Sequence, residues 1–286
     1  MIKGIGHNAM RVTDMEKALE FYCGIVGMKK VFDIHQEDGR PWIEYLKVGE
    51  GAFFELFYDG VKRREPAYHA KRIGYHHWCV STNDLERLAQ ESYSRGWISE
   101  PKPGLGRDGN WNLWIHDPDG NALEFVKYSP ESPHMKSNAA PYDYDRKGLT
   151  GIGHVAFTVS DMDASLNFYR DILGFKLICS LDNESGEPWL NYLRVSDGSY
   201  IELFYGGQYK AKCERDDAGF MHLCLECDDV PATVADIRGK GAPIDNEPKQ
   251  GKDLNTQAWT HDPDGNKVEL MSIHPDSPQA KASMVV

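Results

Sequence analysis

The sequence lacks any apolar run of the roughly 20 residues that a helix needs to cross a bilayer. Its first residues, Met-Ile-Lys-Gly-Ile-Gly, also lack the apolar segment of a signal peptide. Basic charge is scarce, because 32 Lys and Arg stand against 44 Asp and Glu, and the formal charge is -12. Nucleic acids and anionic membranes are bound by basic patches. We therefore expect a cytoplasmic protein that binds neither nucleic acid nor membrane.

The six cysteines do not follow the spacing of a disulfide framework, which favours a reducing compartment. Cys224 and Cys227 have the spacing of some metal and redox pairs. They lie on a predicted strand, however, where residues three apart face opposite sides. We do not expect this pair to be functional.

What the sequence does contain is an internal repeat. Gly-Ile-Gly-His at 4–7 returns at 151–154, and His-Asp-Pro-Asp-Gly-Asn at 116–121 returns at 261–266. A chain of 286 residues with 41% apolar residues can bury a large core and favours two domains. The organisation expected is a domain at 1–132, a linker without periodicity at 133–149, a second domain at 150–275 and a loose tail at 276–286.

Each half is predicted to hold two units with the order strand, helix and three strands. In the first unit, Thr13 and Glu16 form a capping box, and Gly27 ends the helix. Its strands are expected at 4–12, 29–35, 42–48 and 52–58. The same plan returns at 75–128, in the second copy of the first unit, and at 219–274. The fold class is therefore α+β, with four βαβββ modules.

Each module opens on a strand with a histidine and closes on a strand with a glutamate. The four pairs are His7 and Glu55, His77 and Glu124, His154 and Glu202, and His222 and Glu269. Because a βαβββ module brings its first and last strands together, both side chains can point into one concave face. Two facing modules then supply two imidazoles and two carboxylates. Such a set suits a divalent metal ion, with nickel, cobalt, manganese or iron favoured over zinc.

With these motifs the sequence resembles the vicinal oxygen chelate superfamily, which includes glyoxalase I, bleomycin resistance proteins and extradiol dioxygenases. The resemblance rests on the Gly-x-x-His strands, the segment 14–22 that leads to Gly27, and the Asp-Pro-Asp-Gly-Asn turns before Glu124 and Glu269. It covers nearly the whole chain outside the linker and tail. It implies two tandem glyoxalase-like domains in which facing modules form a metal cup.

The resemblance leaves two pairings of the modules open. If adjacent modules face each other, the ligand sets are His7, Glu55, His77 and Glu124 in one site and His154, Glu202, His222 and Glu269 in the other. Some fused relatives instead pair the first module with the fourth and the second with the third. The sequence does not choose between these arrangements.

Four protein ligands on a six-coordinate ion leave two positions for a substrate with two adjacent oxygens. The ion can polarise a carbonyl and stabilise the enediolate that forms when the neighbouring carbon loses its proton. By resemblance to glyoxalase I, Glu124 and Glu269 are the expected bases, with Glu55 and Glu202 as their opposite partners. The favoured hypothesis is an isomerase, epimerase or lyase of the glyoxalase type, acting on an α-hydroxycarbonyl small molecule.

Two alternatives stay open. An extradiol dioxygenase would hold Fe(II) with His154, His222 and Glu269. Glu202 then adds a fourth ligand, and the stretch 256–261 lacks the tyrosine expected ahead of the last glutamate. The other alternative is a protein that binds a small ligand without chemistry, which full ligand sets in both halves disfavour. For partners, we expect a small-molecule substrate, and a homodimer stays open.

Several further residues are candidates for substrate contact. Arg11, on the strand face of His7, occupies the place where glyoxalase I has an arginine for the glutathione carboxylate, and Thr158 stands there in the second copy. The other candidates are cysteines two residues after a histidine, strand tryptophans, and the charges of two matched loops: Cys79, Cys224, Trp42, Trp114, Trp189, Trp259, Arg107 and Lys252. His76 is expected to face away from the site, because it directly precedes His77 on the strand.

Overall fold

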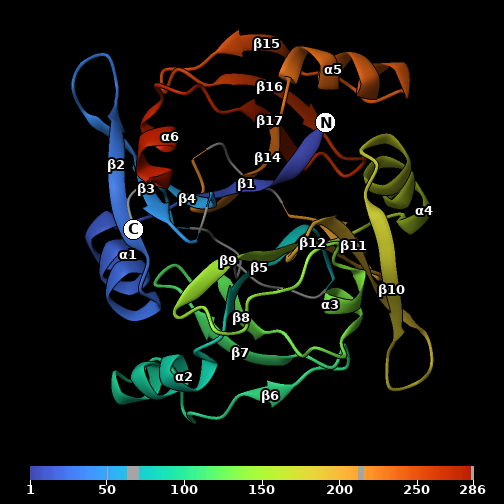
Figure 1. The fold of residues 1–286 in the computed structure, drawn as a ribbon. Coiled ribbons are helices and arrows are strands. Elements are labelled where there is room, and N and C mark those ends of the chain that lie inside the picture. The colour runs from blue at the N-terminus through green and yellow to red at the C-terminus, as the bar shows by residue number, and fades with distance from the viewer. Residues whose placement is uncertain (50, 63–70, 212–215, 285–286) are drawn as a thin grey trace.

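The computed structural model describes residues 1–49, 51–62, 71–211 and 216–284, which form two curled sheets with helices around them (Figure 1). Unit 1 comprises β1 (Ile2–Arg11), α1 (Met15–Phe21), the π-helical turn η1 (Tyr22–Val26), β2 (Lys29–His35), β3 (Pro41–Lys47) and β4 (Phe53–Phe57). Unit 2 comprises β5 (Arg72–Thr82), α2 (Leu85–Ser94), β6 (Gly104–Leu105), β7 (Trp111–His116) and β8 (Ala122–Lys127), and α3 (Pro133–Ser137) follows it.

The second half of the chain repeats this order. Unit 3 comprises β9 (Leu149–Thr158), α4 (Met162–Leu166), η2 (Asn167–Ile172), β10 (Lys176–Asp182), β11 (Pro188–Ser196) and β12 (Ser199–Phe204). The short β13 (Tyr209–Lys210) lies between this unit and the next. Unit 4 comprises β14 (Gly219–Cys227), α5 (Val230–Gly239), β15 (Asn246–Gln250), β16 (Thr256–His261) and β17 (Lys267–Ser272), and α6 (Pro278–Ser283) follows it. The predicted α+β class with four βαβββ modules is confirmed.

Each sheet combines one unit from each half of the chain. One sheet has the strand order β15-β16-β17-β14-β1-β4-β3-β2 and joins units 4 and 1. The other has the order β10-β11-β12-β9-β5-β8-β7-β6 and joins units 3 and 2. The strands that meet at the joint, β1 with β14 and β5 with β9, are antiparallel. Residues 1–132 and 150–275 therefore each contribute to both sheets, and the pairing of first with fourth unit is the one adopted.

The start of α1 differs from the predicted capping box. Asp14, not Thr13, is the cap, and its side chain accepts a hydrogen bond from the backbone N–H of Lys17 at 3.1 Å. The hydroxyl of Thr13 instead bonds the carboxylate of Asp119 at 2.5 Å, in the Asp-Pro-Asp-Gly turn of unit 2. Ser160 and Asp264 make the same bond in the second half. This position therefore links one unit to the next rather than capping a helix.

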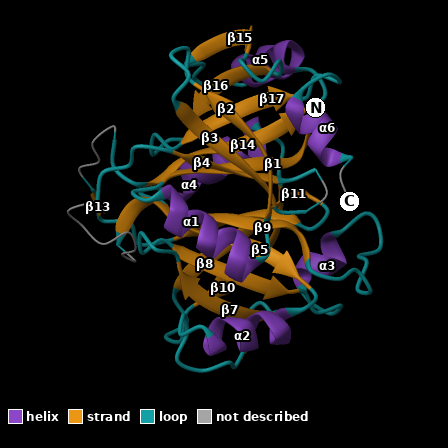
Figure 2. Cartoon of the chain, turned by 90° about the vertical axis from the view of Figure 1, so that its left-hand side faces the viewer, coloured by secondary structure: helices purple, strands orange, loops and turns teal. Residues whose placement is uncertain are grey.

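The Asp-Pro-Asp-Gly turns also anchor the helices of the preceding units. The buried hydroxyl of Tyr22 donates to Asp117 at 2.8 Å, and that of Tyr169 donates to Asp262 at 2.9 Å. Asp117 further accepts a bond from the backbone N–H of Asn121 at 2.8 Å. Figure 2 shows α1 between the two sheets. The two units of each half are thus packed through their helices, although their strands belong to different sheets.

The linker and the tail are more ordered than predicted. Within 133–149, α3 buries His134, and within 276–286, α6 buries Gln279. Asn110 bonds His134 at 3.0 Å, and Asn255 bonds Gln279, so both short helices are fixed to the sheets. The Ser-Pro pairs at 132–133 and 277–278 are 145 residues apart, as are His77 and His222, so the two short helices belong to the repeat. The expectation of a loose tail was wrong, and residues 285–286 lie outside the described part.

The structure bears on the expectations for membrane spans and for cysteines. In the described part of the chain, no helix is long and apolar enough to span a membrane. Cys213 lies outside the described residues, and the other five cysteines are free thiols.

We expect Tyr22→Phe to lower the free energy of unfolding by about 1–3 kcal/mol, because a buried oxygen of Asp117 loses a donor. Urea denaturation measures the change. Tyr93→Phe is the control, since Tyr93 is 46% exposed and a surface change of this kind shifts stability by less than about 0.5 kcal/mol. Equal stabilities of the two variants would contradict the role given to the Tyr22 hydroxyl.

Candidate metal centres

The eight histidines and glutamates of the repeat gather into two buried clusters, one in each sheet. Site A consists of His7, Glu55, His222 and Glu269, from β1, β4, β14 and β17. Site B consists of His77, Glu124, His154 and Glu202, from β5, β8, β9 and β12. None of the eight is more than 6% exposed. The sets that the two modules of one half would give do not form, because the two units of each half lie in different sheets.

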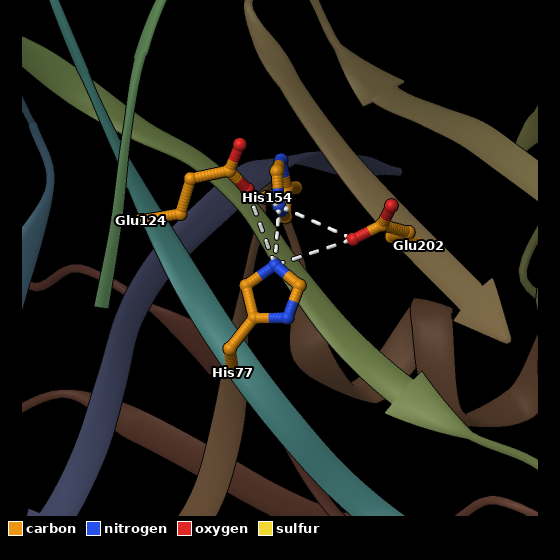
Figure 3. Close-up of side chains that lie close together, drawn as sticks. All are labelled: His77, Glu124, His154 and Glu202. Carbon is orange, nitrogen blue, oxygen red and sulfur yellow. Dashed lines mark hydrogen bonds and ion pairs between the residues drawn. The ribbon is translucent and has the colours of Figure 1, made fainter. Parts of the chain in front are cut away.

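In site B the four side chains point at one another from four neighbouring strands (Figure 3). The Nε2 atoms of His77 and His154 are 2.9 Å apart. Oε2 of Glu124 lies 3.2 Å from His77 and 3.0 Å from His154. Oε2 of Glu202 lies 3.3 Å from each imidazole. Four donor atoms therefore converge on one point.

Site A repeats this arrangement with slightly longer contacts. The Nε2 atoms of His7 and His222 are 3.0 Å apart. Glu269 lies 3.0 Å from His7 and 3.4 Å from His222. Glu55 lies 3.3 Å from His7 and 3.6 Å from His222. The two sites thus share one design.

These distances fit a divalent metal ion. Nitrogen and oxygen ligands bind such ions at about 2.1 Å, so two donors at right angles stand about 3.0 Å apart. Two carboxylates buried this close together also need positive charge between them. His77, Glu124, His154 and Glu202 can hold an ion by both criteria as one set of four. In site A the ligand atoms come together in two groups of three, one of His7, Glu55 and His222 and one of His7, Cys224 and Glu269. The metal itself is not fixed by the donor types.

Without a metal, protons supply part of this positive charge. Burial lowers the pKa of His77, but its bonds to Glu124 and Glu202 outweigh burial and raise that pKa to about 9. Burial raises the pKa of Glu124, but the charges and hydrogen bonds of the imidazoles lower it to about 2. In site A, burial keeps the pKa of Glu55 above its ordinary value in spite of the imidazoles. The imidazole proton and a metal ion therefore compete for the same place.

Tyrosines hold one carboxylate of each site. Tyr192 shares a hydrogen bond with Glu202, and Tyr45 shares one with Glu55. Burial raises the pKa of both phenols well above the ordinary value, so they stay neutral donors. The ring of His134, from α3, packs at 4.4 Å against Tyr192. The segment expected to be a linker thus supports the wall of site B.

His76 is a residue of site B that the regular strand pattern missed. Tyr75 pairs with Phe157 and His77 with Ala156, so His76 is the extra residue of a β-bulge. The bulge breaks the alternation of faces and brings Nδ1 of His76 to 2.7 Å from Nδ1 of His77. Burial lowers the pKa of His76 to about 2, so this imidazole is neutral. The expectation that His76 faces away was wrong, because alternation holds only for a regular strand.

A cavity of about 460 Å³ opens over site B, and it brings several substrate-contact candidates together. Trp114 lies edge-on to His77 with ring centroids 4.6 Å apart, and Trp189 packs against Phe204 at 5.7 Å. Arg107 also lines the cavity and donates to the backbone oxygen of Asp182 at 3.1 Å. The walls near the cluster are aromatic, and positive charge lies at Arg107.

The matching candidates lie around site A. Trp259 lies edge-on to His222 at 4.8 Å. The ammonium group of Lys252 lies over the ring of Trp42 at 5.3 Å. Arg11 forms an ion pair with Asp216 at 3.0 Å. The charged candidates at this site thus already have protein contacts.

The two cysteine candidates are fully buried. The sulfur of Cys224 lies within 4.8 Å of ligand atoms of His7 and Glu269. Burial raises the pKa of both thiols well above the ordinary value, so Cys79 and Cys224 are neutral beside the carboxylates.

The iron triad expected for a dioxygenase does not form. His154 contacts Glu124 and Glu202 in site B. His222 and Glu269 contact each other in site A. His154 lies in the other sheet from His222 and Glu269, because the units pair across the halves.

Comparison with known proteins places the chain among glyoxalase-like proteins. Residues 4–125 and 151–270 match the model of the Glyoxalase/Bleomycin resistance protein/Dioxygenase superfamily. Glyoxalase I of Saccharomyces cerevisiae is 25% identical, over 93% of this chain and 91% of the yeast protein. Lactoylglutathione lyase of Schizosaccharomyces pombe is 25% identical, over 93% of this chain and 95% of that protein.

Solved structures share the fold. Glyoxalase I from Zea mays superimposes with a TM-score of 0.68 and 21% identity, over 94% of this chain and 92% of that chain. A putative dioxygenase from Bacillus subtilis superimposes with a TM-score of 0.71 and 16% identity, over 100% and 91% of the two chains. At these identities the likeness concerns the fold alone.

We expect the metal-free protein to lose stability as pH rises through about 9. The folded pKa of His77 is raised from 6.5 to about 9, so its contribution is fully present below pH 6.5 and is lost as pH rises through the folded value. Thermal unfolding in the presence of a chelator, followed between about pH 6 and 10, measures the loss. His77→Gln is the control and should show a smaller loss across the same range. Identical pH profiles of the two proteins would contradict this account.

Proposed function

The chain belongs to the Glyoxalase/Bleomycin resistance protein/Dioxygenase superfamily, and from this membership we propose that it is a divalent-metal-dependent isomerase, epimerase or lyase. Its substrate in this proposal is a small molecule with two adjacent oxygens, such as an α-hydroxycarbonyl compound. The observation that carries the proposal is the convergence of two imidazoles and two carboxylates below the cavity of site B. Site A offers the same donors.

In this proposal, His77, His154, Glu124 and Glu202 hold the ion in site B. A bound divalent ion supplies a Lewis acid for the adjacent oxygens of the substrate. Burial of the four ligands excludes water from one side of the reacting atoms, which strengthens the electrostatic interactions of the site. The protein residues then have to move a proton between neighbouring carbons.

We assign the proton transfer to Glu124 in site B and to Glu269 in site A. Glu202 shares a hydrogen bond with Tyr192, which holds that carboxylate in place. Both carboxylates contact the two imidazoles of the site, but within the described residues only Glu202 has such a tyrosine bond. A base has to reach the carbon acid, accept its proton and return it to the adjacent carbon through an enediolate. The carboxylate without the tyrosine bond suits that movement better.

The walls of the cavity suggest the shape of the substrate. Trp114, Trp189 and Phe204 form an apolar surface, and Arg107 and Lys71 lie on the same cavity. Aromatic walls bind an apolar body, and a guanidinium group binds a carboxylate or phosphate. We infer a substrate with an apolar part and an anionic or polar end. Since two full-length relatives are named for glyoxalase I and lactoylglutathione lyase activity, a glutathione adduct is the first compound to test.

We expect Glu124→Gln to reduce proton exchange at site B by about 10²–10⁴-fold, because the amide cannot accept the proton. The measurement is incorporation of solvent deuterium into an α-hydroxycarbonyl substrate, with the metal-loaded protein and without oxygen. Glu269→Gln is the matched variant at site A, and the ratio of the two losses apportions activity between the sites. Glu131→Gln, at an exposed carboxylate, is the control.

The same assay separates the alternatives. Oxygen uptake with a catechol, in place of deuterium incorporation, would support a ring-cleaving dioxygenase. Metal binding without either reaction would support a ligand-binding protein. Wild-type exchange in a variant with both Glu124 and Glu269 replaced would contradict the assignment of the base.

A further inference from the structure

The two metal sites differ at the residue before the β5 or β14 histidine. His76 precedes His77 in site B, and Met221 precedes His222 in site A. Both are extra residues of a β-bulge, because the strand pairing shifts at the same place in each sheet. A bulge turns the extra side chain out of the regular alternation. Met221 accordingly packs with the apolar residues beside site A, and His76 lines the cavity of site B.

The contact between His76 and His77 requires a defined placement of protons. Their Nδ1 atoms are 2.7 Å apart, which is a hydrogen bond with one donor and one acceptor. Nε2 of His77 faces His154 and both carboxylates, so Nε2 is the atom that binds a cation. A histidine that gives its Nε2 lone pair to a metal carries its hydrogen on Nδ1. His77 is then the donor, and Nδ1 of His76 is the acceptor.

The acceptor is held rigidly. The ring of His76 stacks on Phe204 with centroids 4.5 Å apart and planes inclined by 13°. His76 is 8% exposed and His77 is 1% exposed, so bulk water competes little for their bond. A thioether sulfur, which Met221 has at the matched place, is only a weak acceptor. The two sites therefore differ in the hydrogen-bond acceptor beside the β5 or β14 histidine, which is an imidazole in site B and a thioether in site A.

We propose that His76 is a positioning residue of site B, where it accepts the Nδ1 hydrogen of His77 and directs Nε2 of His77 toward the cation. The proposal rests on the metal site of the proposed function. Loss of such a partner commonly weakens metal binding by about 10–100-fold. Site B should accordingly bind a divalent cation more tightly than site A.

The test uses zinc alone as the probe, titrated into the full-length apoprotein in competition with a chelator. A background with Glu55→Gln and Glu269→Gln weakens site A, so that the tight binding measured is that of site B. In this background we expect His76→Met to weaken zinc binding by about 10–100-fold. His76→Asn should recover most of the affinity, because its amide oxygen lies near the place of Nδ1. A general effect of substitution on the fold would not be rescued by asparagine.

The reciprocal substitution, Met221→His, tests whether adding the acceptor imidazole strengthens zinc binding at site A. In a background with Glu124→Gln and Glu202→Gln, Met221→His should strengthen zinc binding at site A. Thermal unfolding of every variant controls for folding.

A second measurement needs no substitution. Long-range ¹⁵N spectra of the zinc-loaded wild-type protein report which ring nitrogen of His77 and His76 carries hydrogen. We expect hydrogen on Nδ1 of His77 and on Nε2 of His76. Hydrogen on Nε2 of His77 would overturn the proposal even where a variant fails to fold.

The outcomes separate this inference from the proposed function. If the wild-type protein binds zinc and His76→Met binds it equally well, the role of His76 is wrong and the metal site stands. If the wild-type protein binds no divalent cation, the proposed function and the role of His76 are both wrong.

Discussion

The structure depends on one electrostatic constraint, which is the burial of two carboxylates and two imidazoles in one cluster in each sheet, with each carboxylate 3.0–3.6 Å from both imidazoles. Two carboxylates buried in one cluster are unfavourable in an apolar interior unless positive charge lies between them. The four central strands of each sheet meet this constraint by presenting one ligand each. Tyr45 and Tyr192 satisfy a further carboxylate oxygen from the side. Each cluster could therefore hold a cation or, without one, a shared proton.

Close approach of the central strands is part of the same construction. A Cβ atom on Gly153 would lie 3.0 Å from the Tyr128 hydroxyl and 3.3 Å from the sulfur of Cys79. On Gly6 it would lie 3.6 Å from the sulfur of Cys224. Gly153, the glycine before His154, thus leaves room for Tyr128 and Cys79, whereas a Cβ atom on Gly6 would make an ordinary contact. This gives the second Gly-Ile-Gly-His copy a steric reason as well as a chemical one.

The gathering of histidines and glutamates could be predicted because a single unit determines the placement of one His and Glu pair. The first and last strands of a βαβββ unit pair in parallel, as β1 does with β4 and β9 with β12. The nearly constant spacing of His and Glu, 48 residues in units 1 and 3 and 47 in units 2 and 4, therefore indicates a shared face. The α+β class and an enzyme of the glyoxalase type were predicted on this basis and from the resemblance, and both are confirmed. The pairing between units was not predictable in this way, since β5 and β14 carry the same pattern.

The pairing of the units is accompanied by contacts that the sequence does not reveal, because the residues that make them have the pattern of a turn. Asp117 was assigned to a turn, but it also binds Tyr22 of the preceding unit. This bond and its counterpart from Tyr169 to Asp262 hold adjacent units together through their helices. In both halves the units joined by these bonds each pair their first strand with a unit of the other half. Short helices escaped prediction for another reason, because the five or six residues of α3 and α6 show too few turns for a period of 3.6.

Duplication preserved the ligands of the two sites and not their surroundings. His134 packs behind site B, and Gln279 takes the same place behind site A. Near the cup walls, Glu44 pairs with Lys30 at 2.7 Å, whereas its counterpart Asn191 bonds Ser180. Since the donor atoms are alike, a difference in metal affinity or substrate between the sites has to come from such neighbours.

Strand register explains how the two sites can keep the same histidines and glutamates while their neighbouring residues differ. A slip of one residue would turn every ligand to the opposite face of its strand. In each sheet a bulge precedes the histidine and sets its partner: Met221 is the extra residue before His222, which pairs with Ala9, and His76 is the extra residue before His77, which pairs with Ala156. The bulge thus aligns the histidines with the clusters, while the side chain of the extra residue differs, being His76 in one sheet and Met221 in the other. The same backbone irregularity that aligns the ligands therefore creates the position at which the two sites diverge.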